Sequence, residues 1–460
     1  MPTEVFASTI PEKENPEYSS FDDVKGEDEE IGNIVTELTD ERTETSKKFL
    51  LDSGTKMIAE YDTPIHYQND KGDWVEYNNS LKAENSTSTA DEASDGEYTN
   101  ISSNIDVKLS NKAKANNMIK VSSDDYSISW GYDDTNKNKI KIVNNNEKLY
   151  GNEEFTTLKN ITSEAKYENV YKNVDLQYFV TSTGVKENII LKSSDVQNEF
   201  NLTYKIKNLT AKQTDDYTIT LYNKSNEEVY TIIAPYMTDA NGKTSTQLKL
   251  ELISQKGGNA SVKLTADYWF IHSLGRSFPI TVDPELTIKK NAIMPLYNGD
   301  GNIYHSYGPY ENSSSKYLIA KMNSLPELDD GEKIVSAKFN FEIYNYNTLF
   351  ANANENSIIV NAHKLTSMNS MSVTYDSAIE DYDSLTYNDN QFMSFDLTKL
   401  MNEWYSNGDE PDGFVLESYD TVGSKQVTIN DSGKKYPAFT ITYKDFTGME
   451  SNLSYHTFSV

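Results

Sequence analysis

Short segments in which apolar and polar residues alternate recur along most of this chain, and they constrain its fold more than any other feature. Residues 105–109 (IDVKL), 126–130 (YSISW) and 200–206 (FNLTYKI) are examples. An apolar side chain at every second position gives a β-strand one face that packs on a core and one that meets water. The pattern predicts an all-β protein from residue 46 to about residue 444.

The composition requires such strands to be held by hydrophobic cores. The 460 residues include no cysteine, which excludes disulfides, thiolate nucleophiles and cysteine-ligated metals. Tyrosine occurs 32 times and phenylalanine 17 times, and aromatic residues favour half-buried strands over helices. A chain of this length has room for several domains. No run of about 18 apolar residues occurs, so no transmembrane segment is expected.

A net charge of −29 limits the partners that the chain can attract. So acidic a surface repels the phosphates of nucleic acids. Arg42 and Arg276 are the only arginines beside forty lysines, so bidentate clamps on phosphate or carboxylate groups are scarce. We therefore expect no nucleic-acid partner.

Residues 1–45 are expected to be the remainder of a signal peptide and a disordered acidic leader. Val5, Phe6 and Ala7 resemble the small-residue end of a secretory signal peptide. Residues 8–45 are rich in acidic and hydroxyl side chains and have little to bury. We expect a secreted or cell-wall-associated protein whose mature chain begins near Ser8. The alternative is a cytosolic N-terminus that carries this triplet by chance.

Three regions are expected to follow the leader. Residues 46–284 are expected to form a β-rich N-terminal region. This region is either one unit or two subdomains that divide near residues 145–165. Pro284 marks its end, because proline cannot continue a strand ladder. Residues 285–445 are predicted to form a jelly-roll β-sandwich with one short helix, and residues 446–460 a linker.

The expected helix lies near the end of the C-terminal region. Leu397, Leu400, Met401 and Trp404 are spaced i, i+3, i+4 and i+7, which places them on one helical face. We expect this face, including Trp404, to pack into the core and not to form an exposed ligand platform.

Several segments resemble a known architecture of exported proteins. In the N-terminal region they are residues 48–55 (KFLLDSGT), 63–67 (TPIHY), 72–77 (GDWVEY), 174–178 (VDLQY), 185–191 (VKENIIL), 234–242 (APYMTDANG) and 279–284 (PITVDP). Together they resemble the N-terminal part of secreted Rhs/YD-repeat proteins of Gram-positive bacteria. Residues 443–450 (YKDFTGME) and 453–456 (LSYH) are similar to the junction that precedes the repeats.

The C-terminal region resembles the DNRLRE domain, a β-sandwich similar to carbohydrate-binding modules. The matching segments are residues 334–339 (IVSAKF), 395–398 (FDLT), 402–405 (NEWY) and 412–416 (DGFVL). The arginine-rich motif that gives this domain its name has no counterpart here, and Tyr375 stands where a tryptophan is frequent.

By this resemblance, the chain is the exported delivery and anchoring region of a wall-associated polymorphic toxin. The resemblance implies a downstream repeat and toxin region in the full-length protein, and no catalysis in these residues. It also implies that the C-terminal sandwich binds cell-wall or extracellular polysaccharide. Two alternatives remain open: a structural stalk or adhesin that binds no glycan, and a polysaccharide-degrading enzyme that uses a pair of carboxylates.

Catalytic motifs are missing from the sequence. The five histidines form neither an H-x-x-x-H nor an H-E-x-x-H pair, and there is no G-x-S-x-G elbow or P-loop. A glycosidase needs only two carboxylates about 5–10 Å apart, and among 71 acidic residues such pairs arise by chance. We therefore expect that the chain is not an enzyme and that it needs no cofactor.

A tyrosine-rich segment is the candidate glycan site. Tyr304, Tyr307 and Tyr310 could stack on the C–H faces of sugars, and Asn312 could bind hydroxyl groups. The alternative is a loop that packs its own rings.

Two glycine-containing segments concentrate oxygen donors that could hold a structural Ca²⁺. One contains Asp300, and the other contains Asp409 and Asp412. Neither has the spacing of an EF-hand, so solvated turns are the alternative, and no other metal is expected.

Overall fold

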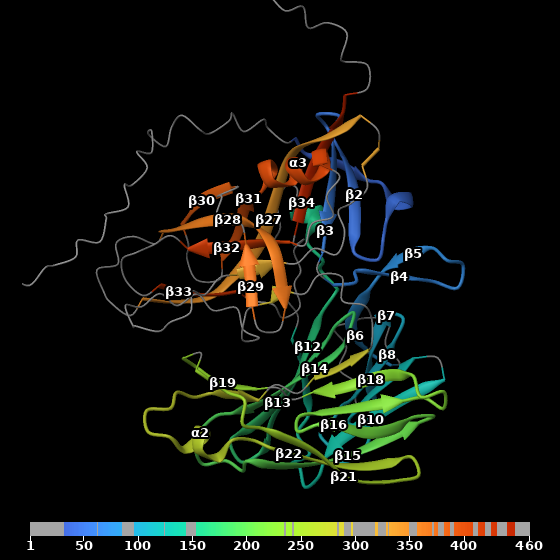
Figure 1. The fold of residues 1–460 in the computed structure, drawn as a ribbon. Coiled ribbons are helices and arrows are strands. Elements are labelled where there is room, and N and C mark those ends of the chain that lie inside the picture. The colour runs from blue at the N-terminus through green and yellow to red at the C-terminus, as the bar shows by residue number, and fades with distance from the viewer. Residues whose placement is uncertain are drawn as a thin grey trace, which may run out of the picture.

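The computed structural model describes a subset of the chain (Figure 1). The described residues are 32–61, 63–84, 96–123, 125–143, 153–233, 236–241, 243–282, 285–288, 296–297, 318–320, 328–329, 331–348, 357–369, 372–375, 381–386, 391–407, 413–418, 425–429 and 439–446. They form antiparallel sheets with a few short helices, which confirms the predicted all-β class. Among them, no helix is long and apolar enough to cross a membrane.

The first sheet of the N-terminal sandwich has eight described strands. In spatial order they are β21 (Lys249–Lys256), β22 (Asn259–Thr265), β15 (Glu199–Lys207), β10 (Tyr126–Tyr132), β9 (Ile119–Ser123), β8 (Asp106–Ser110), β7 (Glu97–Ser102) and β6 (Asn78–Ala83). Alternation works here as predicted, because β15 buries Phe200, Leu202, Tyr204 and Ile206 and turns the residues between them outward or to half-exposed positions.

The second sheet lies against the first. Its path runs through β11 (Ile140–Val143), β12 (Ser163–Tyr171), β13 (Val174–Val180), β14 (Gly184–Leu191), β24 (Glu285–Ile288), β18 (Glu228–Ile233), β17 (Thr218–Tyr222) and β16 (Thr210–Asp215), with β19 (Met237–Asp239), β20 (Thr244–Ser245) and β23 (Ile280–Val282) beside it. The inner faces of both sheets contribute to one continuous core. Strands on either side of residues 145–165 pair with each other in this sheet, as Ile140 with Tyr167.

A second sandwich contains the C-terminal strands. One sheet runs β1 (Ile34–Glu37), β2 (Ser46–Leu51), β3 (Lys56–Glu60), β34 (Phe439–Asp445), β27 (Glu332–Thr348) and β31 (Gln391–Asp396), and β33 (Lys425–Ile429) also pairs with β27. The other contains β25 (Leu296–Tyr297), β26 (Leu318–Ala320), β32 (Phe414–Ser418), β28 (Ser357–Asn369), β29 (Ser372–Tyr375) and β30 (Asp381–Thr386). Phe339 and Phe439 of the first sheet pack on Phe414 of the second, with ring centroids 5.3 and 6.0 Å apart.

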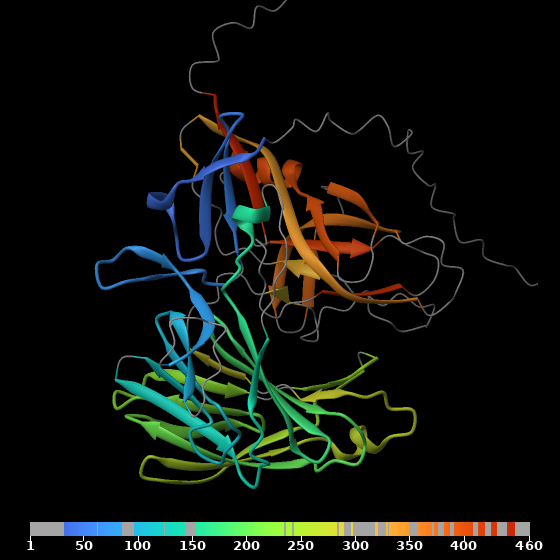
Figure 2. The same ribbon diagram turned by 180° about the vertical axis from the view of Figure 1, so that it is seen from behind.

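The first described strands, β1–β3, therefore belong to the same sheet as β34, the last described strand. β3 and β34 pair along their length, with Ile58 opposite Ile441 and Lys56 opposite Tyr443. Figure 2 shows these blue strands beside the red strand, above the N-terminal sandwich. The sequence placed residues 46–60 with the N-terminal region, whereas the sheet joins them to the C-terminal region. The region limits and the jelly-roll connectivity stay predictions.

The predicted helix is α3 (Thr398–Asn407), and its apolar face is buried as expected. Leu397, Leu400, Met401 and Trp404 are all fully buried. Thr398, the half-exposed first residue of the helix, ties it to β27, because its hydroxyl accepts a hydrogen bond of 2.9 Å from the backbone N–H of Ala337. The prediction that Trp404 is a core residue is confirmed.

Candidate functional site

The residues predicted to bind ligands lie outside the described residues. This applies to the glycan candidates Tyr304, Tyr307, Tyr310 and Asn312, and to the Ca²⁺ candidates Asp300, Asp409 and Asp412. Both sites stay predictions. The described residues contain two other features that could serve a function, a polar pocket where the sandwiches join and an exposed aromatic face.

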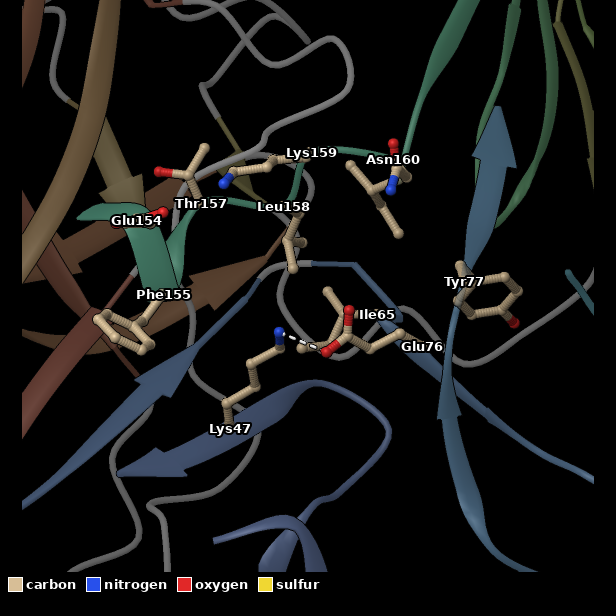
Figure 3. Close-up of a pocket in the computed structure, with 11 residues that line it drawn as sticks. Lys47, Ile65, Glu76, Tyr77, Glu154, Phe155, Thr157, Leu158, Lys159 and Asn160 are labelled. Atoms are coloured by element: carbon tan, nitrogen blue, oxygen red, sulfur yellow. Dashed lines mark hydrogen bonds and ion pairs between the residues drawn. The ribbon is translucent and has the colours of Figure 1, made fainter. Parts of the chain in front are cut away.

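The pocket lies between the N-terminal strands and the segment that enters β12, and its volume is about 190 Å³. Figure 3 shows the lining residues: Lys47 and Glu76 come from the N-terminal strands, Phe155 from the helix α1, and Leu158 from the residues that follow this helix. The helix α1 (Glu153–Thr156) begins that segment, and the hairpin of β4 (His66–Gln68) and β5 (Trp74–Glu76) carries Glu76.

Hydrogen bonds hold the pocket segment to both sandwiches. On one side, the hydroxyl of Tyr61, which follows β3, donates to the carbonyl oxygen of Thr156. On the other side, the amide of Asn79 on β6 donates to the carbonyl oxygen of Ile161 over 2.7 Å. The pocket is therefore a built part of the joint between the sandwiches.

A network of ion pairs forms the polar side of this joint. Arg42 contacts Glu37 at 2.6 Å and Glu76 at 3.1 Å, and Lys47 contacts Glu76 at 2.7 Å. Burial alone would raise the pKa of Glu76, but the cations of Lys47 and Arg42 outweigh it and hold that pKa below its usual range. Glu76 thus stays ionised and compensates the buried ammonium of Lys47.

His66 lies fully buried beside the network. Burial lowers the pKa of its imidazole to about 4, so the ring is neutral at pH 7. Nδ1 lies 2.6 Å from the carbonyl oxygen of Thr43, which assigns the proton to Nδ1. Nε2 then carries a lone pair, and it has no hydrogen-bond partner among the described residues.

By position, His66 could join two carboxylates around a metal ion. One donor atom each of Glu37, His66 and Glu76 lie within 4.8 Å of one another. The carboxylates, however, already contact Arg42 and Lys47, and these cations oppose a divalent ion at the same place. The arrangement favours a salt-bridge network over a metal centre. Sequence spacing could not reveal it, because the three residues come from β1, β4 and β5.

We expect Glu76→Gln to lower the free energy of unfolding by about 1 kcal/mol, because Lys47 and Arg42 both lose a partner while the half-exposed position screens the effect. Urea denaturation measures the change, which should shrink in 1 M salt. The matched control is Glu168→Gln, which removes an exposed pair with Lys141 and should change stability little. Equal losses in the two variants would contradict a special role for the network.

The aromatic face lies on the short helix α2 (Tyr268–His272) of the N-terminal sandwich. Trp269 is 80% exposed and Tyr268 is 49% exposed, whereas the next two residues of the helix, Phe270 and Ile271, are buried. The rings of Tyr268 and Trp269 meet edge to face with centroids 5.5 Å apart. On its other side, Tyr268 stacks on His272 at 4.1 Å.

Polar contacts fix the base of this face. Asp267 caps α2 by accepting a hydrogen bond of 3.0 Å from the N–H of Phe270. The guanidinium of Arg276 lies 3.5 Å from the centre of the Phe270 ring and 2.6 Å from the carboxylate of Asp239. Burial would raise the pKa of Asp239, but Arg276 and backbone N–H groups outweigh it and hold that pKa below its usual range.

Three curated relatives are similar to part of this chain, and all three are named WapA nucleases. The tRNA3(Ser)-specific nuclease WapA of Bacillus spizizenii is 24% identical over 321 residues, which cover 64% of this chain and 13% of that protein. The tRNA(Glu)-specific nuclease WapA of Bacillus subtilis subsp. natto is 25% identical over 260 residues, covering 55% of this chain and 10% of that protein. The tRNA nuclease WapA of Bacillus subtilis strain 168 is 24% identical over 261 residues, with the same coverage.

No family model matches the chain, so the predicted DNRLRE domain is not confirmed. Among solved structures, the tandem CBM22 domains of Paenibacillus barcinonensis Xyn10C are 10% identical and cover 68% of this chain and 91% of that one. The TM-score of 0.11 is too low for this likeness to carry an argument.

The chain is thus distantly similar to WapA, in agreement with the coarser part of the predicted resemblance to Rhs/YD-repeat toxins. They correct two expectations. The prediction that the chain is not an enzyme is wrong by this comparison, because the relatives are named nucleases. The exclusion of nucleic acid loses its support for the same reason. The chain spans only about a tenth of the length of these relatives.

Proposed function

We propose that this chain is the binding and anchoring region of a secreted, wall-associated protein of the WapA kind, and that it binds extracellular polysaccharide. The observation that carries the proposal is the similarity to WapA over 321 residues, which cover 64% of this chain. The pocket segment is hydrogen-bonded to both sandwiches and lies beside the salt-bridge network, so the two sandwiches form a stiff support suited to holding a larger protein at a surface.

The net charge of −29 bears on the kind of polymer. A strongly acidic surface is repelled by polymers rich in phosphate or carboxylate groups. Neutral sugar chains carry no such penalty. Each contact is expected to be weak, so residence at the wall would depend on many contacts along a repeating polymer.

Retention on purified Gram-positive cell walls tests the proposal. We expect the 460-residue chain to sediment with walls from which anionic polymers have been removed, and a neutral wall oligosaccharide to release it. Absence of retention on walls would leave the stalk alternative as the better account. Incubation of the same protein with tRNA, followed by gel electrophoresis, tests whether the activity named for the relatives resides in these residues.

A further inference from the structure

We infer that the aromatic face of α2, formed by Tyr268, Trp269 and His272, is a binding site for a pyranose unit of a neutral polysaccharide. The inference rests on the proposed function and assigns it to described residues of the N-terminal sandwich, away from the predicted tyrosine loop. Large aromatic rings at a surface normally turn inward to bury their apolar area. Trp269 is instead 80% exposed, while its neighbour Phe270 takes the buried position.

The three rings form a corner with two different walls. The Tyr268 and Trp269 planes meet at 88°, so one flat sugar cannot stack on both at once. A pyranose whose axial C–H groups lie on the indole of Trp269 would touch the Tyr268 ring with its edge. Stacking of Tyr268 on His272, with planes 23° apart, holds that second wall upright.

Polar groups at this corner can pair with hydroxyl groups. The Nδ1 atom of His272 lies 2.8 Å from the carbonyl oxygen of Tyr268, which leaves Nε2 of this exposed ring outside that hydrogen bond. The hydroxyl of Tyr268 is a second donor and acceptor. An apolar ring face with a few fixed polar groups beside it is the general composition of a sugar site.

The rings are held before any ligand arrives. Asp267 caps the helix, and its other carboxylate oxygen accepts a hydrogen bond of 2.7 Å from the hydroxyl of Ser245. Arg276 donates to the carbonyl oxygen of Phe270 over 2.9 Å and to Asp239 over 2.6 Å. Because the loop around α2 is already ordered by these contacts, binding costs less conformational entropy.

Charge favours a neutral sugar over an anionic polymer as the occupant. Arg276, the cation that contacts α2, is already paired with the buried carboxylate of Asp239. The whole chain carries a charge of −29. A phosphate-bearing polymer would therefore be repelled by the chain as a whole, and Arg276 would have to leave Asp239 to bind it.

The test uses the 460-residue chain with hexa-N-acetylchitohexaose, a neutral oligosaccharide hereafter called chitohexaose, as the soluble probe and purified peptidoglycan as the insoluble one. We expect chitohexaose to shift the emission of Trp269 and shield it from iodide. Trp130 and Trp404 are buried, and the signal of the half-exposed Trp74 is subtracted by recording the same titration on Trp269→Ala. Trp269→Ala should weaken binding to both probes at least about tenfold, and Trp269→Phe should restore part of it. The matched control is Ile253→Ala on β21, where an exposed apolar side chain, 60% accessible, is removed from another place.

The outcomes separate this inference from the proposed function. Retention of the wild-type chain on peptidoglycan, with equal retention of Trp269→Ala, would overturn the site and leave the proposed function standing. Failure of the wild-type chain on both probes would overturn both. Loss of wall retention in Trp269→Ala without competition by chitohexaose would show an occupant other than a sugar and overturn the assigned ligand class. Unchanged unfolding curves of the variants establish that any loss is local.

Discussion

Removal of residues 1–61 is expected to abolish folding of the C-terminal sandwich. β34 lies between β3 and β27, and the pairs Ile58–Ile441 and Ala59–Thr440 run through the buried centre of the sheet. Without β1–β3, the backbone groups on one edge of β34 lose their partners and the apolar side chains of Ile441 and Tyr443 lose their cover. We expect residues 62–460 to show no cooperative unfolding of this sandwich and to aggregate.

Circular dichroism and calorimetry on residues 62–460 and on the full chain measure this effect. A peptide of residues 32–61, added in trans, should restore a folded sandwich, because it supplies the missing strands. A milder version is Ile58→Ala, which should cost about 3 kcal/mol through lost burial and a cavity. Val35→Ala on β1 is the control, because its side chain is 59% exposed and should matter little. An unchanged melting transition in residues 62–460 would contradict the shared sheet.

The second large effect concerns Glu187, a carboxyl group buried between the sheets of the N-terminal sandwich. Burial raises its pKa to about 7, and the hydrogen bond that the hydroxyl of Tyr178 donates to this carboxyl group opposes that rise only in part. The folded state therefore binds a proton at this carboxyl more tightly than the unfolded state, whose ordinary value is 4.5. This contribution to stability is fully present below pH 4.5 and is lost as the pH rises through about 7.

Replacing Glu187 by glutamine should remove that pH dependence. A pKa raised from 4.5 to about 7 corresponds to about 3 kcal/mol of stability lost between those pH values. At pH 8, Glu187→Gln should therefore be more stable than the wild type by up to about this amount, because no buried carboxylate has to be ionised. Near pH 4.5 the two proteins should be close in stability. Urea titrations at half-unit steps from pH 4.5 to 8.5 give the difference.

Two other groups also make the stability depend on pH in this range. The measured quantity is therefore the difference in free energy of unfolding between the wild type and Glu187→Gln at each pH. Burial also raises the pKa of Glu60 to about 7, which adds a slope of the same sign. The lowered pKa of His66, about 4, adds the opposite slope, because its stability contribution is present above pH 6.5 and lost as the pH falls through about 4. Both remain in Glu187→Gln, so they cancel in the comparison. A constant difference across the pH range would contradict the assignment to Glu187.

Local patterns predicted the parts of this fold that depend on neighbouring residues. Alternation identified strands such as β15, because each side chain's face follows from its place in the strand. The spacing of Leu397, Leu400, Met401 and Trp404 identified the buried face of α3 for the same reason. A five-residue helix is too short to show a period, so nothing in the alternation marked Tyr268 and Trp269 as exposed.

Contacts between distant strands could not be read in this way. Glu37, His66 and Glu76 meet only because β1, β4 and β5 come together beside the pocket. Likewise, residues 46–60 were placed with the segment that follows them in sequence, and their true partner β34 lies at the other end of the described chain. The sequence motifs also did not predict the nuclease activity for which the WapA relatives are named, because these residues contain no recognisable catalytic motif.

The amino-acid sequence alone determined that this protein is all-β, acidic, free of disulfides and built on aromatic cores, because these properties follow from composition and from the period of a strand. Only the tertiary structure decided which strands share a sheet and which polar and aromatic side chains face one another or the solvent. The physical reason is that an edge strand exposes the same backbone donors and acceptors whatever its sequence. The partner of β3 was therefore selected by burial of Ile58 against its neighbours in the assembled fold, which no local pattern records.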